Sequence, residues 1–251
     1  MLEVKVKKKI IVEVCTASLE DSLDAWEHGA DRIELNNALE LGGLTPSYII
    51  AKEVCRKVDI PVIVMMRPRS GDFAYSKTEF EIMKKEIDNF LEIGVAGFAF
   101  GILNNNETID EERCSQLVKA ATGKECVFHR AFDFIPDPIR SYKKLNQIGF
   151  KRILTSGQKN TAIEGKGLIK NLIKSAGNSI EILPGSVINP SNVIELIEST
   201  GCNQIHGSFG KIVNNKSENY QDQDISKSYK VIDTIMIDRM IETMKSYKFE
   251  S

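Results

Sequence analysis

Side chains that can bind metals or transfer protons stand where several short apolar runs of this sequence end. Cys15 ends a run that begins at Ile10, Glu34 lies in the run Arg32–Leu35, and His129 and His206 end two later runs. If these runs are parallel strands of one barrel, their carboxyl ends meet at one mouth and bring the four side chains together. A thiol with imidazoles suits a soft metal ion, whereas imidazole with carboxylate suits general acid–base chemistry.

The strands that must position these groups recur about every 27 residues, a length that fits a strand, two loops and a helix of three or four turns. Amphipathic stretches of helical periodicity separate them. The eight runs are Ile10–Cys15, Arg32–Leu35, Val62–Met66, Gly97–Gly101, Glu125–His129, Arg152–Thr155, Glu181–Pro184 and Asn203–His206. Parallel strands need a crossover, which the helices supply. The even spacing predicts a single (β/α)8 TIM-type barrel with outer helices and disfavours the alternative, an open sheet. No G-x-G-x-x-G follows the first strand, which counts against a dinucleotide-binding fold.

Local signals mark several helix ends. Ser76 and Glu79 form a capping box, and Ser18 is placed to cap the first helix. Proline after Thr45 and after Asn189 indicates two further helix starts. The last helix is expected over residues 231–247, with apolar residues at helical spacing.

We expect residues 1–251 to form one TIM-barrel domain with a basic N-terminal arm over residues 1–9. The stretch 211–230 is polar and follows the eighth strand, and we expect it to be irregular. A loop of that length is usually either functional or disordered. Residues 211–230 are therefore a candidate lid loop over the mouth, with disorder as the alternative.

Composition excludes several classes of protein. Charged residues make up 27% of the 251 and the formal net charge is −2, so nucleic-acid binding lacks the required surplus of Lys and Arg. The apolar run after the N-terminal lysines is too short for a signal peptide or a membrane span, and we expect a cytoplasmic protein without membrane contact. The five cysteines are scattered, which favours free thiols over disulfides.

One hypothesis for the mouth is an enzyme that acts on a small phosphorylated or carboxylated metabolite. Its polar cluster would be Glu34, Arg67, His129, Asp133 and His206, with a histidine as general acid or base and Arg67 as an anion clamp. Glycines and hydroxyls after strands six to eight form a candidate phosphate-binding set. That set is Ser156, Gly157, Gly185, Ser186 and Ser208.

The roles of the two strand glutamates stay open between structure and function. Glu13 and Glu34 lie within apolar strands, where an unpaired carboxylate would be costly to bury. We expect their partners among Arg67, Arg69 and Arg130, whose guanidinium groups suit carboxylates. Strand alternation prevents His129 and Arg130 from both pointing inward, and we expect His129 to do so.

A second hypothesis is a soft-metal site. Cys15 alone among the cysteines lies at the carboxyl end of a strand, and its thiolate could hold Cu(I) with His129 or His206. Met65 and Met66 could add thioether ligands. The ordinary alternative is a buried free cysteine without a metal. A third reading of the chain is a binding or assembly protein without chemistry.

Several motifs resemble those of the CutC family, in the same order and from about residue 12 to residue 206. They are Glu13-Val14-Cys15, Gly29 to Leu35 (GADRIEL), Gly42 to Ser47 (GGLTPS), Arg67 to Phe73 (RPRSGDF), Phe128 to Asp133 (FHRAFD) and Leu154 to Gln158 (LTSGQ). The resemblance implies a barrel of this class, a cytoplasmic location, a homo-oligomer, and a role in copper homeostasis through copper binding.

The same resemblance implies copper ligands near the ends of the first two strands, where the family has two cysteines. Cys15 matches the first position, but Asn36 stands at the second. An amide is a poor ligand for Cu(I), so a two-thiolate site cannot form in this chain. The family's glycine-rich turn after strand seven is also altered, to Gly185-Ser186-Val187.

Overall fold

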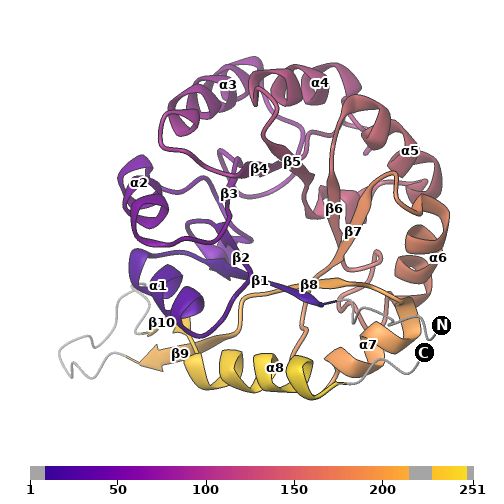
Figure 1. The fold of residues 1–251 in the computed structure, drawn as a ribbon. Coiled ribbons are helices and arrows are strands. Elements are labelled where there is room, and N and C mark those ends of the chain that lie inside the picture. The colour runs from indigo at the N-terminus through magenta and orange to yellow at the C-terminus, as the bar shows by residue number, and fades with distance from the viewer. Residues whose placement is uncertain (1–8, 215–227, 248–251) are drawn as a thin grey trace, which may run out of the picture.

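The computed structural model describes residues 9–214 and 228–247. Figure 1 shows an inner ring of strands surrounded by an outer ring of helices. The barrel strands are β1 Ile11–Thr16, β2 Arg32–Leu35, β3 Val62–Met65, β4 Gly97–Phe100, β5 Glu125–Phe128, β6 Arg152–Thr155, β7 Glu181–Pro184 and β8 Gln204–Gly207. The helices are α1 Leu19–Glu27, α2 Tyr48–Lys57, α3 Lys77–Leu91, α4 Glu111–Ala120, α5 Pro138–Ile148, α6 Lys166–Ala176, α7 Val193–Thr200 and α8 Thr234–Ser246, with short 3₁₀ turns at η1 Leu39–Leu41 and η2 Arg130–Phe134.

The eight strands form one parallel sheet in the order β7-β6-β5-β4-β3-β2-β1-β8. A parallel bridge between Gly185 and His206 joins β7 to β8, the two ends of this order, so the sheet closes into a barrel. The prediction of a (β/α)8 barrel is therefore confirmed, and each strand boundary lies within one residue of its predicted position.

Alternation along the strands sorts the side chains into two cores. One set of strand residues packs outward against the apolar faces of the helices, as Val64 and Phe98 do. The other set points into the barrel, where its apolar members form a small separate cluster. That cluster consists of Ile63, Met65, Ala99, Val127, Leu154 and Leu183.

The amino ends of the strands close the barrel with charged side chains rather than apolar ones. Arg32 Nη2 donates to Gln204 Oε1 over 3.0 Å, and Arg152 Nε donates to Glu181 Oε2 over 3.1 Å. Arg152 also pairs with Glu125. We call this group the charged layer: Glu13, Arg32, Glu125, Arg152, Glu181 and Gln204. Because Arg32, Arg152 and Glu13 are nearly inaccessible to water, each charge there depends on its partners.

The helix-end predictions are confirmed in part. The Ser76–Glu79 capping box is present, and Ser18 Oγ accepts a hydrogen bond from the Asp21 amide. The two proline-based predictions were wrong by a few residues, since α2 begins after Ser47 and α7 begins after Asn192. The proline segments instead form extended or turn structure that leads into each helix, as the geometry of X–Pro favours.

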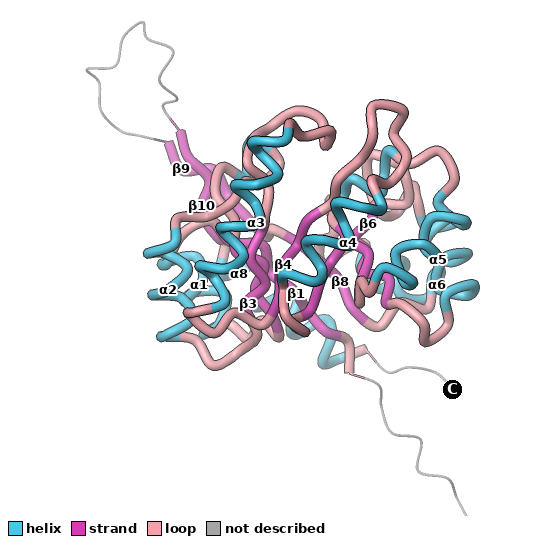
Figure 2. Tube along the Cα trace, turned by 90° about the horizontal axis from the view of Figure 1, so that it is seen from above, coloured by secondary structure: helices cyan, strands magenta, loops and turns pink. Residues whose placement is uncertain are grey.

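The segment after β8 is not the irregular stretch that its polar composition predicts. Its two ends pair as an antiparallel hairpin, β9 Gly210–Asn214 and β10 Ser228–Ile232. The hairpin projects beside α1 and α8 (Figures 1 and 2). Each of its strands has only five residues, and the apolar residues do not alternate strictly with polar ones, so the strand signal in the sequence is weak. The middle of the proposed lid loop, residues 215–227, and residues 1–8 of the proposed arm lie outside the described residues.

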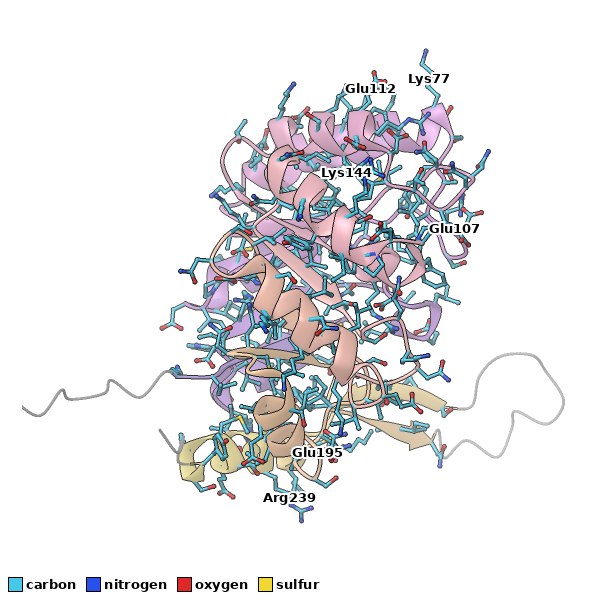
Figure 3. All side chains as sticks on the ribbon, turned by 90° about the vertical axis from the view of Figure 1, so that its right-hand side faces the viewer. Lys77, Glu107, Glu112, Lys144, Glu195 and Arg239 are labelled. Atoms are coloured by element: carbon cyan, nitrogen blue, oxygen red, sulfur yellow. The ribbon has the colours of Figure 1, made fainter. Side chains whose placement is uncertain are left out.

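The hairpin also shortens the last helix, which begins at Thr234 rather than at residue 231. Asp21 on α1 accepts a hydrogen bond from the Ile232 amide over 2.9 Å, and this bond ties β10 to the barrel wall. Charged side chains such as Lys144, Glu195 and Arg239 point outward from the outer helices (Figure 3). In the part of the chain that the structure describes, no helix is long and apolar enough to cross a membrane.

Arg32→Met should lower the free energy of unfolding by about 3–5 kcal/mol, because it removes the closest cationic partner of the buried Glu13 carboxylate. Urea unfolding measures the loss. Lys144→Met is the matched control, since it breaks an exposed pair with Glu111 and should cost less than about 1 kcal/mol. Equal effects of the two substitutions would show that the charged layer does not stabilise the barrel as we describe.

Candidate metal and acid–base site

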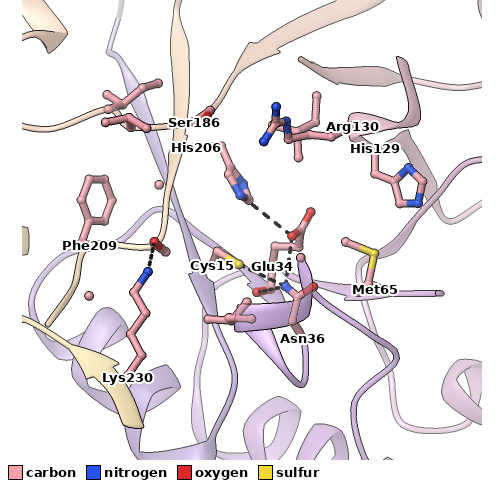
Figure 4. A pocket seen from close by; sticks show the side chains of 18 of the residues that line it. Cys15, Glu34, Asn36, Met65, His129, Arg130, Ser186, His206, Phe209 and Lys230 are labelled. Atoms are coloured by element: carbon pink, nitrogen blue, oxygen red, sulfur yellow. Dashed lines mark hydrogen bonds and ion pairs between the residues drawn. The ribbon is translucent and has the colours of Figure 1, made fainter. Parts of the chain in front are cut away.

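A pocket of about 540 Å³ opens at the carboxyl ends of the strands. Its base is polar, with Cys15, Glu34, Asn36 and His206 gathered on one side (Figure 4). Much of its wall is apolar, contributed by residues of β3, β6, α8 and several loops. These wall residues include Leu39, Met65, Phe73, Phe134, Leu154, Val187, Ile188, Phe209 and Met236.

Three potential metal ligands lie together at the base of this pocket. One ligand atom each of Cys15, Glu34 and His206 lie within 4.8 Å of one another. Strand register explains the arrangement, because Cys15 on β1 is paired with Glu34 on β2 and Glu13 is paired with His206 on β8. Glu13 and Cys15 are two residues apart on β1 and so face the same way, into the barrel.

Asn36 contacts two of these three groups. Its Nδ2 lies 3.2 Å from Cys15 Sγ and 3.0 Å from Glu34 Oε1, and it also donates to the Glu34 carbonyl. The side chain that stands at the family's second cysteine position therefore acts as a hydrogen-bond donor to the thiol and the carboxylate.

Glu13 connects the charged layer to the mouth. One carboxylate oxygen accepts from His206 Nδ1 over 2.7 Å, and the other pairs with Arg32. Burial by itself favours a neutral carboxyl, but Arg32, and after it His206 and Arg152, hold the pKa of Glu13 well below its usual range. Glu13 is therefore a fixed anion beneath the imidazole.

His206 is held as a cation between two carboxylates. Burial opposes its charge, but the nearby Glu34, Cys15 and Glu13 together raise the pKa of His206 well above its ordinary value. Its Nε2 lies 4.0 Å from Glu34 Oε1. Burial also raises the pKa of the Glu34 carboxyl and of the Cys15 thiol, and His206 opposes both shifts. The cluster can thus share and transfer protons, or exchange them for a metal ion.

His129 also lines the pocket, as predicted, but it stands apart from this cluster on the side of Met65 (Figure 4). Its Nδ1 accepts from the Ala131 amide over 3.2 Å, so the neutral ring carries its proton on Nε2. Burial, reinforced by Arg67, lowers the pKa of His129 to about 3. Its ring centroid lies 5.0 Å from that of Phe73.

Arg67 and Asp133 both organise loops around the mouth. Arg67 donates to the carbonyl oxygens of Leu41, Gly43 and Gly71, over 2.9 to 3.1 Å. Asp133 accepts from the Ser156 and Gln158 amides and from the Thr155 hydroxyl, and it pairs with Arg130. The role of Arg67 as an anion clamp and the place of Asp133 in a catalytic polar cluster stay predictions. The contacts observed here hold loops and turns in position.

The candidate phosphate loops divide into two groups. Ser186 and Ser208 line the pocket, where Ser186 Oγ donates to the Asn160 carbonyl and Ser208 Oγ accepts from Lys230 over 3.0 Å. Ser156, Gly157 and Gly185 are not among the lining residues. Their amides donate within the protein, to Asp133, Thr155 Oγ1 and the Thr155 carbonyl.

The expected partners of the two strand glutamates were wrong. Arg69 pairs with Asp72 and Glu79, and Arg130 pairs with Asp133, because these arginines follow the strands in loops above the barrel. Glu13 lies deeper, at the level of Arg32, the residue paired with it on the neighbouring strand. Parallel register could have suggested that pair. The closed barrel places β8 beside β1, but the sequence does not set the register between these two strands, so the contact between Glu13 and His206 could not be predicted.

The fold and this site define the class: a parallel (β/α)8 barrel with a buried cluster of thiol, carboxylate and imidazole at its mouth. The family model described as the CutC family matches residues 10–211. The chain is 45% identical over 199 residues to the family protein CutC of Treponema denticola, covering 79% of this chain and 81% of that one. This chain belongs to the CutC family.

Two further comparisons agree. The human copper homeostasis protein cutC homolog is 42% identical over 79% of this chain and 72% of its own length. The crystal structure of CutC from Streptococcus agalactiae superposes with a TM-score of 0.76 and 38% identity, over 79% of this chain and 98% of that one. The family assignment made from the motifs is therefore confirmed.

His129→Gln should flatten the pH dependence of stability. The folded pKa of about 3 lies below the unfolded value of about 6.5, so the unfolded chain binds the additional proton between them. The contribution of neutral His129 is complete above about pH 6.5 and falls by about 1.4 kcal/mol per pH unit as pH drops toward 3.

Urea unfolding of both proteins at pH 7.5, 6 and 5 measures this difference. Phe90→Leu disturbs core packing against Tyr48 and leaves the contacts of His129 in place, so its loss of stability should be equal at all three pH values. Parallel curves for wild type and His129→Gln would contradict a buried neutral imidazole.

Proposed function

We propose that this protein serves copper homeostasis in the cytoplasm by binding one copper ion at the mouth of its barrel. The observation that carries the proposal is the cluster of Cys15, Glu34 and His206, whose ligand atoms lie within 4.8 Å of one another. Related proteins of the family are named for copper homeostasis, among them the human homolog.

The residues at the base fit Cu(I) through two ligands. A cysteine thiolate suits this soft ion, and imidazole suits copper in general. The Nδ1 of His206 is taken by Glu13, which leaves Nε2 as its ligand atom on the side of Cys15 and Glu34. Both ligands must lose protons that the apo cluster retains, so copper affinity should increase with pH.

Cys15→Ser should weaken Cu(I) binding by about 100-fold or more, equivalent to ~2.7 kcal/mol, because it removes the soft ligand. An anaerobic titration against a competing chelator measures the affinity and the stoichiometry, which should be one ion per chain. Cys55→Ser on α2 is the matched control, since this half-buried thiol lies outside the pocket and should leave affinity unchanged. Equal affinity of Cys15→Ser and wild type would refute the site.

A second candidate function is catalysis on a small phosphorylated or carboxylated metabolite. The observation that favours it is the size and lining of the pocket, because a single ion needs no cavity of about 540 Å³ with apolar walls. In this reading the paired Glu34 and His206 transfer a proton at the base, while neutral His129 offers an N–H from the opposite side. Lys230 and Ser208 at the rim add polar contacts for an anionic group.

A thermal-shift screen of phosphorylated and carboxylated metabolites tests this candidate. A ligand present at 100 times its dissociation constant should stabilise the fold by about 2.7 kcal/mol. His206→Gln should weaken such a ligand at least tenfold, about 1.4 kcal/mol, whereas His28→Gln on the outer surface should not. A screen without hits, or hits that both variants bind like wild type, would reject the enzyme reading.

A further inference from the structure

We propose that the cluster at the mouth is also a three-ligand site for a borderline divalent cation of the Zn²⁺ class. Cys15 Sγ, a Glu34 carboxylate oxygen and His206 Nε2 would be the ligands, and Glu13 would orient the imidazole. The inference rests on the copper proposal only in sharing Cys15 and His206. The two differ in the part played by Glu34.

The donor atoms match this class of ion better than they match Cu(I) alone. Cysteine sulfur, imidazole nitrogen and carboxylate oxygen together are the mixed set that Zn²⁺ accepts, whereas Cu(I) gains little from a carboxylate. Bond lengths of about 2.0–2.3 Å around one ion put ligand atoms roughly 3.3–3.8 Å apart in a tetrahedral site. His206 Nε2 and Glu34 Oε1 are 4.0 Å apart. A nitrogen and an oxygen ligand of one ion would be about 3.3–3.6 Å apart, so these two atoms would need to approach by about half an ångström.

Glu13 supplies the contact that metal-binding histidines usually make through their second nitrogen. A ligating imidazole commonly donates its other N–H to a carboxylate, which fixes the tautomer and the ring orientation. Glu13 Oε1 lies 2.7 Å from His206 Nδ1, and Arg32 holds the second oxygen of the same carboxylate. The imidazole therefore presents Nε2 toward Cys15 and Glu34.

Asn36 supports the other two ligands. Its single amide nitrogen lies within 3.2 Å of both Cys15 Sγ and Glu34 Oε1, so it holds the thiol and the carboxylate next to each other. A cysteine at this position would add a second thiolate and make the site softer. With Asn36 in place, the remaining ligand set is mixed and favours a divalent ion.

The three ligands come from β1, β2 and β8, on one side of the pocket base (Figure 4). Such an ion would keep one tetrahedral position open toward the pocket that these residues line. Three protein ligands with an open position are typical of zinc sites that bind water or a ligand directly, whereas purely structural sites are closed by four.

Glu34→Gln separates the two proposals, because a neutral amide cannot replace the carboxylate as an anionic ligand. Zn²⁺ affinity should fall at least tenfold in Glu34→Gln, while Cu(I) affinity should stay within about threefold of wild type. Competition against a chromophoric chelator measures Zn²⁺, and the anaerobic titration measures Cu(I). Glu86→Gln is the matched control, a half-buried carboxyl on α3 outside the pocket that should change neither affinity.

Co²⁺ reports the ligands spectroscopically. Wild type should show a thiolate-to-cobalt charge-transfer band that Cys15→Ser abolishes, and Glu34→Gln should change the visible bands while retaining the thiolate band. Circular dichroism and thermal melting of each variant establish that it is folded. If Glu34→Gln is not folded, Glu34→Asp serves instead, because its shortened carboxylate should weaken Zn²⁺ and leave Cu(I) unaffected.

Binding of Zn²⁺ that depends on Glu34, with Cu(I) affinity independent of it, supports the inference. Binding of Cu(I) without Zn²⁺, or Zn²⁺ binding that ignores Glu34, overturns the inference and leaves the copper proposal standing. Zn²⁺ binding without Cu(I) supports the inference and rejects the copper proposal. Absence of binding for both ions rejects both.

Discussion

The buried carboxylate of Glu13, held between a guanidinium and an imidazole, connects the base of the barrel to its mouth. Arg32 secures one oxygen from the charged layer, and His206 contacts the other from above. A carboxylate at this depth would be costly without partners, and each partner would in turn be costly without the carboxylate. The charge and orientation of His206 therefore depend on residues a full layer beneath the pocket.

That dependence explains how the mouth can hold charged side chains although they are mostly buried. With Glu13 fixed as an anion, His206 remains a cation next to Glu34, and Asn36 donates to both Glu34 and Cys15. These contacts hold the side chains before any ligand arrives, which lowers the cost of binding. The same pre-organisation would suit either the metal ion or the proton transfer that we propose for this site.

The rest of the mouth is held by contacts that keep the loops in place. Arg67 donates hydrogen bonds to three carbonyl groups of two loops, and Asp133 accepts hydrogen bonds from the turn after β6. These charged residues stand in family motifs and look like catalytic candidates in the sequence. In the structure Arg67 donates to backbone carbonyl groups, and Asp133 is occupied by two amides, two hydroxyls and Arg130.

The sequence by itself determined the barrel, its strand boundaries and the face on which Cys15, Glu34, His129 and His206 appear. Hydrophobic periodicity and helix caps are local properties, and the parallel arrangement follows from the crossovers. The sequence did not reveal the hairpin after β8, because its strands are short and interleaved with polar residues. The sequence also did not show that His206 lies in the cluster with Cys15 and Glu34 while His129 lies apart from it, since both histidines lie at the end of a predicted strand in the same way.

Only the tertiary structure decided which of these groups meet. Closure of the sheet brings β8 against β1, and the register of the strands pairs Glu13 with both Arg32 and His206. Residues 193 positions apart thus become hydrogen-bond partners. Contacts of that kind depend on the register and curvature of the whole barrel, which no local pattern encodes.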